Sequence, residues 1–167
     1  MATGSLEFYA SFVRKVDGPC SIICIEEDVM VAGSRNGELS TWEISSGSKK
    51  WSLEFDGHCS SADINDGLVF LSESDNLHCI EIEYGELLWS SELEGSCDLV
   101  KFSNEGIWVT SSVYSLEIQD YYDSAVWLFD YQGGLMEKWS IEGRAWSLDS
   151  VSQAAIIGLR RKECGYR

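Results

Sequence analysis

The side chains best suited to catalysis or metal binding are two histidines, each followed directly by a cysteine, at His58–Cys59 and His78–Cys79. Imidazole and thiolate groups are zinc ligands, so two such pairs brought together would form a zinc site. The chain lacks the Cys-x-x-Cys spacing of common zinc sites, and also the nucleophile elbow, the phosphate loop, the dinucleotide-binding glycines and the His-Glu-x-x-His pair. The sequence therefore predicts no catalytic residue, no metal, no cofactor and no enzyme activity.

A second group of residues is suited to binding rather than to catalysis. Tyrosines and carboxylates gather within residues 113–123, at Tyr114, Glu117, Asp120, Tyr121, Tyr122 and Asp123. Tyrosine side chains bury a large area at a low cost in conformational entropy, so this segment is predicted to be a loop that binds a protein partner. The alternative is a longer hairpin whose tyrosines cover their own sheet.

The chain is strongly acidic, with 12 Lys and Arg against 28 Asp and Glu and a net charge of −16. Such a surface repels phosphate backbones and anionic membranes, so neither nucleic acid nor a membrane is expected as a partner. Acidity favours a basic protein partner, although adaptation to salt would produce the same bias. One basic run, Arg160-Arg161-Lys162, is predicted either to pair across an interface or to protect an exposed strand edge from aggregation.

The cysteines and the absence of apolar runs indicate a reduced, cytoplasmic protein. The first residues show no secretory pattern, and no stretch approaches eighteen apolar residues. Cys20, Cys59 and Cys97 hold one phase of the repeat described next, and Ala145 takes the fourth place. Because alanine replaces cysteine there, the position requires a small buried side chain, and all six thiols are expected to be free.

A block of about 39 residues recurs along the chain. Its junctions read Trp51-Ser-Leu-Glu-Phe-Asp-Gly57-His-Cys59 and Trp89-Ser-Ser-Glu-Leu-Glu-Gly95-Ser-Cys97, with weaker copies at residues 12–20 and 139–145. The junction glycines Gly18, Gly57, Gly95 and Gly143 are 39, 38 and 48 residues apart. Short apolar segments bounded by turn residues, such as Ser34-Arg-Asn-Gly37, fill each block. This period and pattern predict an all-β fold, a β-propeller of four-stranded antiparallel blades.

The predicted domain is a single propeller over residues 1–167 with three full blades and one composite blade. The full blades span residues 19–57, 58–95 and 96–143, and the fourth spans 144–167 and is completed by an outer strand at 7–17. Phe12 stands in the phase of Trp51, Trp89 and Trp139, which supports this outer strand. Supplying the outer strand from the other end of the chain removes an exposed sheet edge.

Residues 29–42, Val-Met-Val-Ala-Gly-Ser-Arg-Asn-Gly-Glu-Leu-Ser-Thr-Trp, followed by Gly47-Ser-Lys-Lys-Trp51, resemble the pyrroloquinoline-quinone-type repeats of quinoprotein-like propellers and, less closely, WD repeats. Trp42 is followed by Glu43 rather than by the aspartate of a regular WD dipeptide. The resemblance implies a propeller over residues 12–167. It also implies three roles: a non-catalytic scaffold for protein–protein interaction, a relative or fragment of a quinone-dependent dehydrogenase, or an assembly-factor propeller. The missing catalytic signatures favour the scaffold.

The sequence leaves three ways to complete the ring. One chain could close a four-bladed ring, two chains could exchange outer strands in a homodimer with eight blades, or further blades could lie on another polypeptide. Quinoprotein-like rings favour seven or eight blades.

Overall fold

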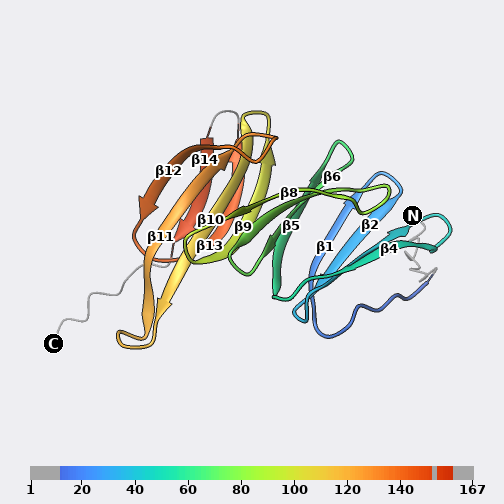
Figure 1. The fold of residues 1–167 in the computed structure, drawn as a ribbon, viewed down its shortest axis with the longest axis horizontal. Coiled ribbons are helices and arrows are strands. Elements are labelled where there is room, and N and C mark those ends of the chain that lie inside the picture. The colour runs from blue at the N-terminus through green and yellow to red at the C-terminus, as the bar shows by residue number, and fades with distance from the viewer. Residues whose placement is uncertain (1–11, 152–153, 160–167) are drawn as a thin grey trace, which may run out of the picture.

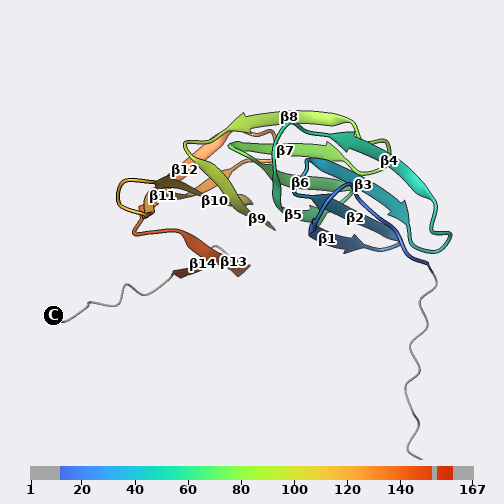
Figure 2. The same ribbon diagram turned by 90° about the horizontal axis from the view of Figure 1, so that it is seen from below.

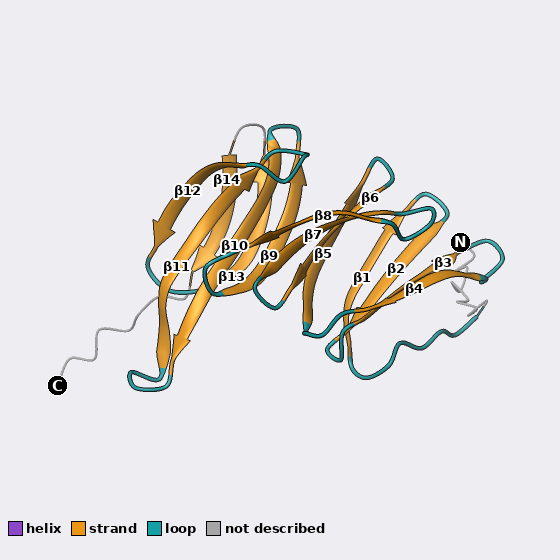
Figure 3. Ribbon diagram, viewed as in Figure 1, coloured by secondary structure: helices purple, strands orange, loops and turns teal. Residues whose placement is uncertain are grey.

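The computed structural model describes residues 12–151 and 154–159, and within them the chain forms strands and turns only (Figure 3). Hydrogen bonding joins the strands into three four-stranded antiparallel sheets and one two-stranded sheet. The three full sheets follow each other along the chain as consecutive meanders (Figure 1). The prediction of an all-β fold built from four-stranded antiparallel blades is therefore confirmed.

The strand bounds follow the repeat. The first blade contains β1 (Cys20–Glu26), β2 (Val29–Ser34), β3 (Glu38–Glu43) and β4 (Lys49–Glu54). The second contains β5 (Cys59–Asn65), β6 (Leu68–Glu73), β7 (Asn76–Glu81) and β8 (Leu87–Glu92). The third contains β9 (Ser96–Ser103), β10 (Gly106–Ser115), β11 (Asp120–Phe129) and β12 (Leu135–Ile141), and the fourth sheet contains β13 (Ala145–Val151) and β14 (Ala154–Leu159).

Blades pack face to face, and the inner strands β1, β5, β9 and β13 contact one another in order. Figure 2 shows these strands on the inside of an arc whose outer side carries β4 and β8. Apolar side chains from the two facing sheets fill each junction, as Val31 and Leu39 of the first blade do against Val69 and Leu71 of the second. Burial of these faces is the main source of stability, because a single four-stranded sheet cannot bury its own apolar side chains.

Two outer-strand tryptophans fasten one blade to the next. The indole of Trp51 in β4 lies over Gly85 and donates from Nε1 to the carbonyl oxygen of Ile82 at 2.8 Å. Trp89 in β8 repeats this arrangement over Gly133 and donates to the carbonyl oxygen of Tyr131 at 3.0 Å. Trp139 does not repeat this arrangement, because the register of β12 places Glu137 opposite Leu128, where Trp51 lies opposite Thr41 and Trp89 opposite Cys79. Trp139 lies two residues farther along β12 and stacks on Trp108 of its own blade. The predicted equivalence is therefore correct for Trp51 and Trp89 and wrong for Trp139.

The segment before the first blade lies against that blade. The ring of Phe12 covers Gly47 in the β3–β4 turn, and Arg14 donates from Nε to the Gly47 carbonyl oxygen at 2.7 Å. The amide of Asp17 donates to the buried carboxylate of Glu38. Burial alone would raise the pKa of Glu38, but hydrogen bonds from Ser40, the Asp17 amide and Lys49 together lower it to about 2.

The predicted outer strand at residues 7–17 is only partly covered by the structure. Residues 12–17 form no strand, because β13 and β14, the sheet they would join, lie at the opposite end of the arc (Figure 1). Residues 7–11 and the expected third strand near Tyr166 lie outside the described residues. The composite fourth blade therefore stays a prediction.

The prediction that the three cysteines in the repeat phase are buried is correct for two of them. Cys59, Cys97 and Ala145 are buried, as expected, and Cys59 packs against Gly33 of the preceding blade. Cys20, in contrast, is exposed, because among the described residues no blade packs against its side of the first sheet. Burial raises the pKa of the Cys59 and Cys97 thiols to about 12. The five cysteines in the described residues are free, and Cys164 lies outside them.

Candidate functional site

The segment predicted to be a loop is mostly strand. β10 and β11 are ten residues each, against six for β2 and β3, and they pair as far as Ser115 and Asp120. Only residues 116–119 form the turn, so the interpretation of residues 113–123 as a loop is wrong and the alternative of a longer hairpin holds. Cross-strand pairing continues because tyrosine and valine favour the extended backbone on both sides. Figure 1 shows this hairpin extending beyond the rest of its blade.

A β-bulge sets the direction of the extension. Ser111 pairs with Ala125 and Val113 pairs with Tyr122, so one residue of β10 lies opposite two residues of β11. Asp123, one of these two, takes a φ of 50°, in the left-handed region. A bulge of this kind bends the strand and increases its twist. The hairpin tip is thereby directed away from the sheet that carries it.

Aromatic side chains hold the base of the hairpin against the inner strand of the fourth sheet. Tyr114 and Tyr121 are direct cross-strand partners, and their rings meet edge to face with centroids 5.1 Å apart. Tyr121 meets the indole of Trp146 in β13 at 6.3 Å, again nearly perpendicular. Edge-to-face pairs of this kind add to the stability gained from burial.

Arg144 lies at the centre of this group. Its guanidinium donates from Nη1 to the Tyr121 hydroxyl at 2.7 Å and lies 4.9 Å and 5.1 Å from the ring centres of Tyr121 and Trp146. Its Nη2 forms an ion pair with Asp98 Oδ1 at 2.6 Å. Asp98 is buried, and burial raises the pKa of its carboxyl despite the hydrogen bond from Ser112 and the charge of Arg144. One cation thus links the hairpin to β9 and to the β12–β13 junction.

The hairpin tip exposes apolar side chains between acidic ones. Leu116 and Ile118 in the turn are 85 % and 60 % exposed, and Tyr114, Tyr122 and Trp146 are also exposed. We call this surface the hairpin patch and define it as Tyr114, Leu116, Ile118, Tyr121, Tyr122, Arg144 and Trp146. Large apolar side chains gathered at one place on a surface mark interaction sites more often than single exposed ones do.

The six predicted partner-binding residues all lie on this hairpin. Tyr114, Tyr121 and Tyr122 belong to the hairpin patch, and Glu117, Asp120 and Asp123 surround it as exposed acidic residues. The predicted interface residues Arg160, Arg161 and Lys162 lie outside the described residues.

Sequence reasoning missed four members of the hairpin patch. Leu116 and Ile118 were detectable as apolar residues at alternate positions in a polar turn, because such a position offers them no core to enter. Arg144 and Trp146 gave no local signal, because their role depends on the packing of β13 beside β10 and β11.

The histidines and cysteines considered for zinc do not form a ligand set. His78 is buried, with Nδ1 2.7 Å from Ser90 Oγ and Nε2 3.3 Å from Glu73 Oε2. Burial lowers the pKa of its imidazole. Across residues 12–151 and 154–159, no three His, Cys, Asp or Glu side chains are grouped so that they could hold a metal ion. No helix in these ranges has the length and apolar character needed to cross a membrane.

Solved structures share this architecture at low sequence identity. The computationally designed Ika4 protein matches with a TM-score of 0.75 and 15 % identity, over 88 % of this chain and 89 % of its own. The designed Ika8 protein matches with a TM-score of 0.71 and 14 % identity, over 83 % of this chain and 42 % of its own. U3-55K matches with a TM-score of 0.73 and 10 % identity, over 86 % of this chain and 46 % of its own.

BamB from Moraxella catarrhalis also matches, with a TM-score of 0.57 and 16 % identity, over 77 % of this chain and 37 % of its own. The chain therefore spans less than half the length of Ika8, U3-55K and BamB.

No curated protein sequence matches this chain. The family model described as outer membrane protein assembly factor BamB matches residues 10–116, the part that contains the first two blades together with β9 and β10. The chain, with its pyrroloquinoline-quinone-type propeller repeats, belongs to this BamB-like family.

Proposed function

We propose that this protein is a non-catalytic propeller scaffold that binds a protein partner through the hairpin patch. The observation that carries the proposal is the hairpin tip, where Leu116 and Ile118 are exposed on a strand pair longer than its neighbours. Leaving such side chains in water has no benefit for folding, so contact with a partner explains their presence best.

The base of the hairpin suits this role because side-chain contacts hold it to the neighbouring strands. Arg144 bonds to Tyr121 of the hairpin and to Asp98 of the inner strand, and it lies against Trp146. A surface that is already ordered loses less conformational entropy when it binds. The tip therefore has a stable base from which to present its apolar side chains.

The charge around the hairpin patch defines the chemistry of the partner. Glu117, Asp120 and Asp123 are exposed beside the apolar side chains, and the whole chain carries a net charge of −16. A complementary surface would combine apolar side chains with lysine or arginine. Membership of a family named for an assembly factor supports a scaffold role in the assembly of other proteins.

Two substitutions in the turn test the proposal. We expect Leu116→Ser with Ile118→Ser to reduce retention of protein partners from an extract of the source cells at least about tenfold, because each buried aliphatic side chain contributes about 1.5–3 kcal/mol. The measurement is quantitative mass spectrometry of proteins retained by the immobilised chain.

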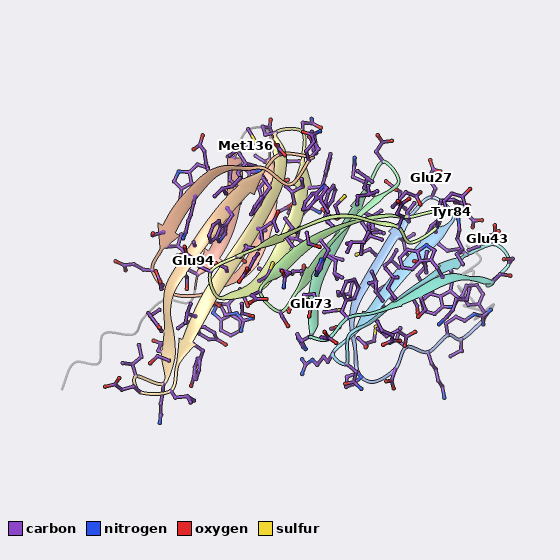
Figure 4. All side chains as sticks on the ribbon, viewed as in Figure 1. Glu27, Glu43, Glu73, Tyr84, Glu94 and Met136 are labelled. Carbon is purple, nitrogen blue, oxygen red and sulfur yellow. The ribbon has the colours of Figure 1, made fainter. Side chains whose placement is uncertain are left out.

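The matched control is Tyr84→Ser. Tyr84 is equally a large exposed side chain on a turn, but it lies on the second blade, away from the hairpin (Figure 4). Partners that the hairpin variant loses should remain bound to the control. Equal retention by the parent, the hairpin variant and the control would exclude the hairpin patch as the binding surface.

A further inference from the structure

Every blade has two faces that play different roles. We call the face toward the following blade the front face and the face toward the preceding blade the rear face. Equivalent front-face positions on the second strand of each sheet are Val31, Phe70, Trp108 and Ile156, spaced by 39, 38 and 48 residues like the junction glycines. Equivalent rear-face positions on the inner strands are Ile23, Ala62, Val100 and Leu148. Their cross-strand partners on the second strand of each sheet are Ala32, Leu71, Val109 and Ile157, in the same order.

Within the chain, each front face is covered by the next rear face. Val31 packs in the cluster that also holds Ala62, and Phe70 packs in the cluster that holds Val100. Trp108 packs against Leu148 in the same way. The three blade junctions are therefore copies of one type of interface.

Within the described residues, one front face is uncovered, and one rear face is covered only in part, by the segment that begins at Phe12. The front-face counterparts of Ile156, which are Val31, Phe70 and Trp108, are all buried. Ile156 itself is 57 % exposed, and Val151 on the same face is exposed as well. Ile23 on the first inner strand is 66 % exposed, and its neighbour Ile25 is also exposed. These two surfaces are the two halves of the interface that the chain uses three times, and they lie at opposite ends of the arc (Figures 1 and 2).

The N-terminal segment already occupies part of a missing preceding blade. Phe12 covers Gly47 in the way that Trp51 covers Gly85 and Trp89 covers Gly133. In both other cases the covering residue belongs to the outer strand of the preceding blade. The segment at Phe12 thus takes the place of an outer strand whose inner strands are not among the described residues at this end of the arc.

We propose that a second copy of this chain supplies the inner strands of the blade that precedes the first one. The front face of β13–β14 of one copy docks on the rear face of β1–β2 of the other, and a twofold axis repeats the contact, which closes an eight-bladed ring. A second copy is the occupant that the surfaces favour, because one chain carries each half of the interface once. The length agrees, because the chain spans 42 % of Ika8 and 46 % of U3-55K, so that two copies approach one such protein.

The mass in solution tests the proposal. By light scattering after size-exclusion chromatography, we expect the parent chain at about 10 µM, a concentration at which specific dimers persist, to have twice the mass of one chain. Ile156→Glu and Ile23→Glu should each raise the dimer Kd by at least about 100-fold, because the symmetry places each substitution in both interfaces. The control is Leu135→Glu, which introduces the same charge at an exposed residue of β12 and should leave the mass unchanged.

A mixture of the two variants distinguishes this arrangement from other dimers. A front-face variant and a rear-face variant together can form one intact interface, so the mixture should recover a species of twice the mass at concentrations where each variant alone is monomeric. Two rear faces in contact would give no such recovery. Circular dichroism of each variant should retain the parent's β spectrum.

Cys20 provides an independent measure of the same contact. It lies where Cys59 packs against the preceding blade, so docking should cover it. We expect iodoacetamide to modify Cys20 at least about tenfold faster in the Ile156→Glu variant than in the parent. A monomeric parent, an open series of larger oligomers, or failure of the mixture to pair would overturn the proposal. Each of these outcomes is independent of whether the hairpin patch binds its partner.

Discussion

Replacing Gly85 with alanine is expected to destabilise the protein by about 3 kcal/mol. Gly85 has a φ of 74°, in the left-handed region where a side chain costs about 1–2 kcal/mol. A Cβ atom at this position would also lie 2.7 Å from the ring of Trp51, closer than packed atoms approach. The indole would have to move and lose its hydrogen bond to Ile82, and such overpacking costs about 1–3 kcal/mol more.

Gly67→Ala is the matched control for this prediction. Gly67 has almost the same φ, 73°, but the nearest atom to its added Cβ would be an Ile82 carbon at 3.8 Å, an ordinary contact. The control therefore carries the backbone cost without the collision, and we expect a loss of about 1 kcal/mol. The free energies of unfolding, measured with urea, would decide. Equal losses in the two variants would mean that Trp51 does not fasten the first blade to the second.

The repeat made most of the fold predictable. The phase of Trp51 and Trp89 placed the outer strands of the first two blades correctly, because both indoles cover a turn glycine of the following blade. Phe12 could be assigned to that phase although its segment forms no strand, because what recurs is an aromatic ring over a turn glycine. A position that repeats its contacts repeats its residue type, and such signals survive without any other sequence for comparison.

Predictions were weaker where the repeat is interrupted. The third blade is about ten residues longer than the others, and the added residues have no counterpart from which to predict their conformation. Their tyrosines suit either a loop or a strand. The bulge opposite Ser112 and the pairing of Tyr114 with Tyr121 then depend on the strands beneath, which continue the ladder beyond the usual blade length.

The ends of the arc show a different limit of the sequence. Ile23 and Cys20 have the residue types of interior positions, and the repeat phase predicted burial for Cys20. A residue type reports the environment for which it is suited, whereas exposure depends on whether a neighbouring blade is present. Residues of an interior type at exposed positions are therefore informative, and they carry the inference of a second copy.

The largest electrostatic effect is expected at Arg144. Arg144→Ala would leave the buried Asp98 carboxylate without its cation, and breaking a buried pair in this way costs about 3–5 kcal/mol. Because Arg144 is itself partly exposed, we expect a loss of about 2–4 kcal/mol at pH 7. The hairpin would also lose its link to β9, so amide hydrogen exchange in residues 113–123 should accelerate.

The acid dependence of this loss identifies its cause. Burial already raises the pKa of Asp98, and removing Arg144 removes a charge that lowers it, so the pKa of Asp98 should rise further in the variant. A carboxyl whose folded pKa is raised destabilises the fold once it ionises, as the pH rises through that pKa. The difference in unfolding free energy between the parent and Arg144→Ala should therefore shrink as the pH falls from 7 toward 4.

The double variant Asp98→Asn with Arg144→Ala completes the argument. Without a carboxylate to neutralise, the loss of Arg144 should cost about 1 kcal/mol or less, which reflects only its contacts with Tyr121 and Trp146. The pH dependence should vanish together with the carboxyl. If Arg144→Ala is equally costly in the presence and absence of Asp98, the arginine acts through its aromatic contacts, and the ion pair does not hold the hairpin in place.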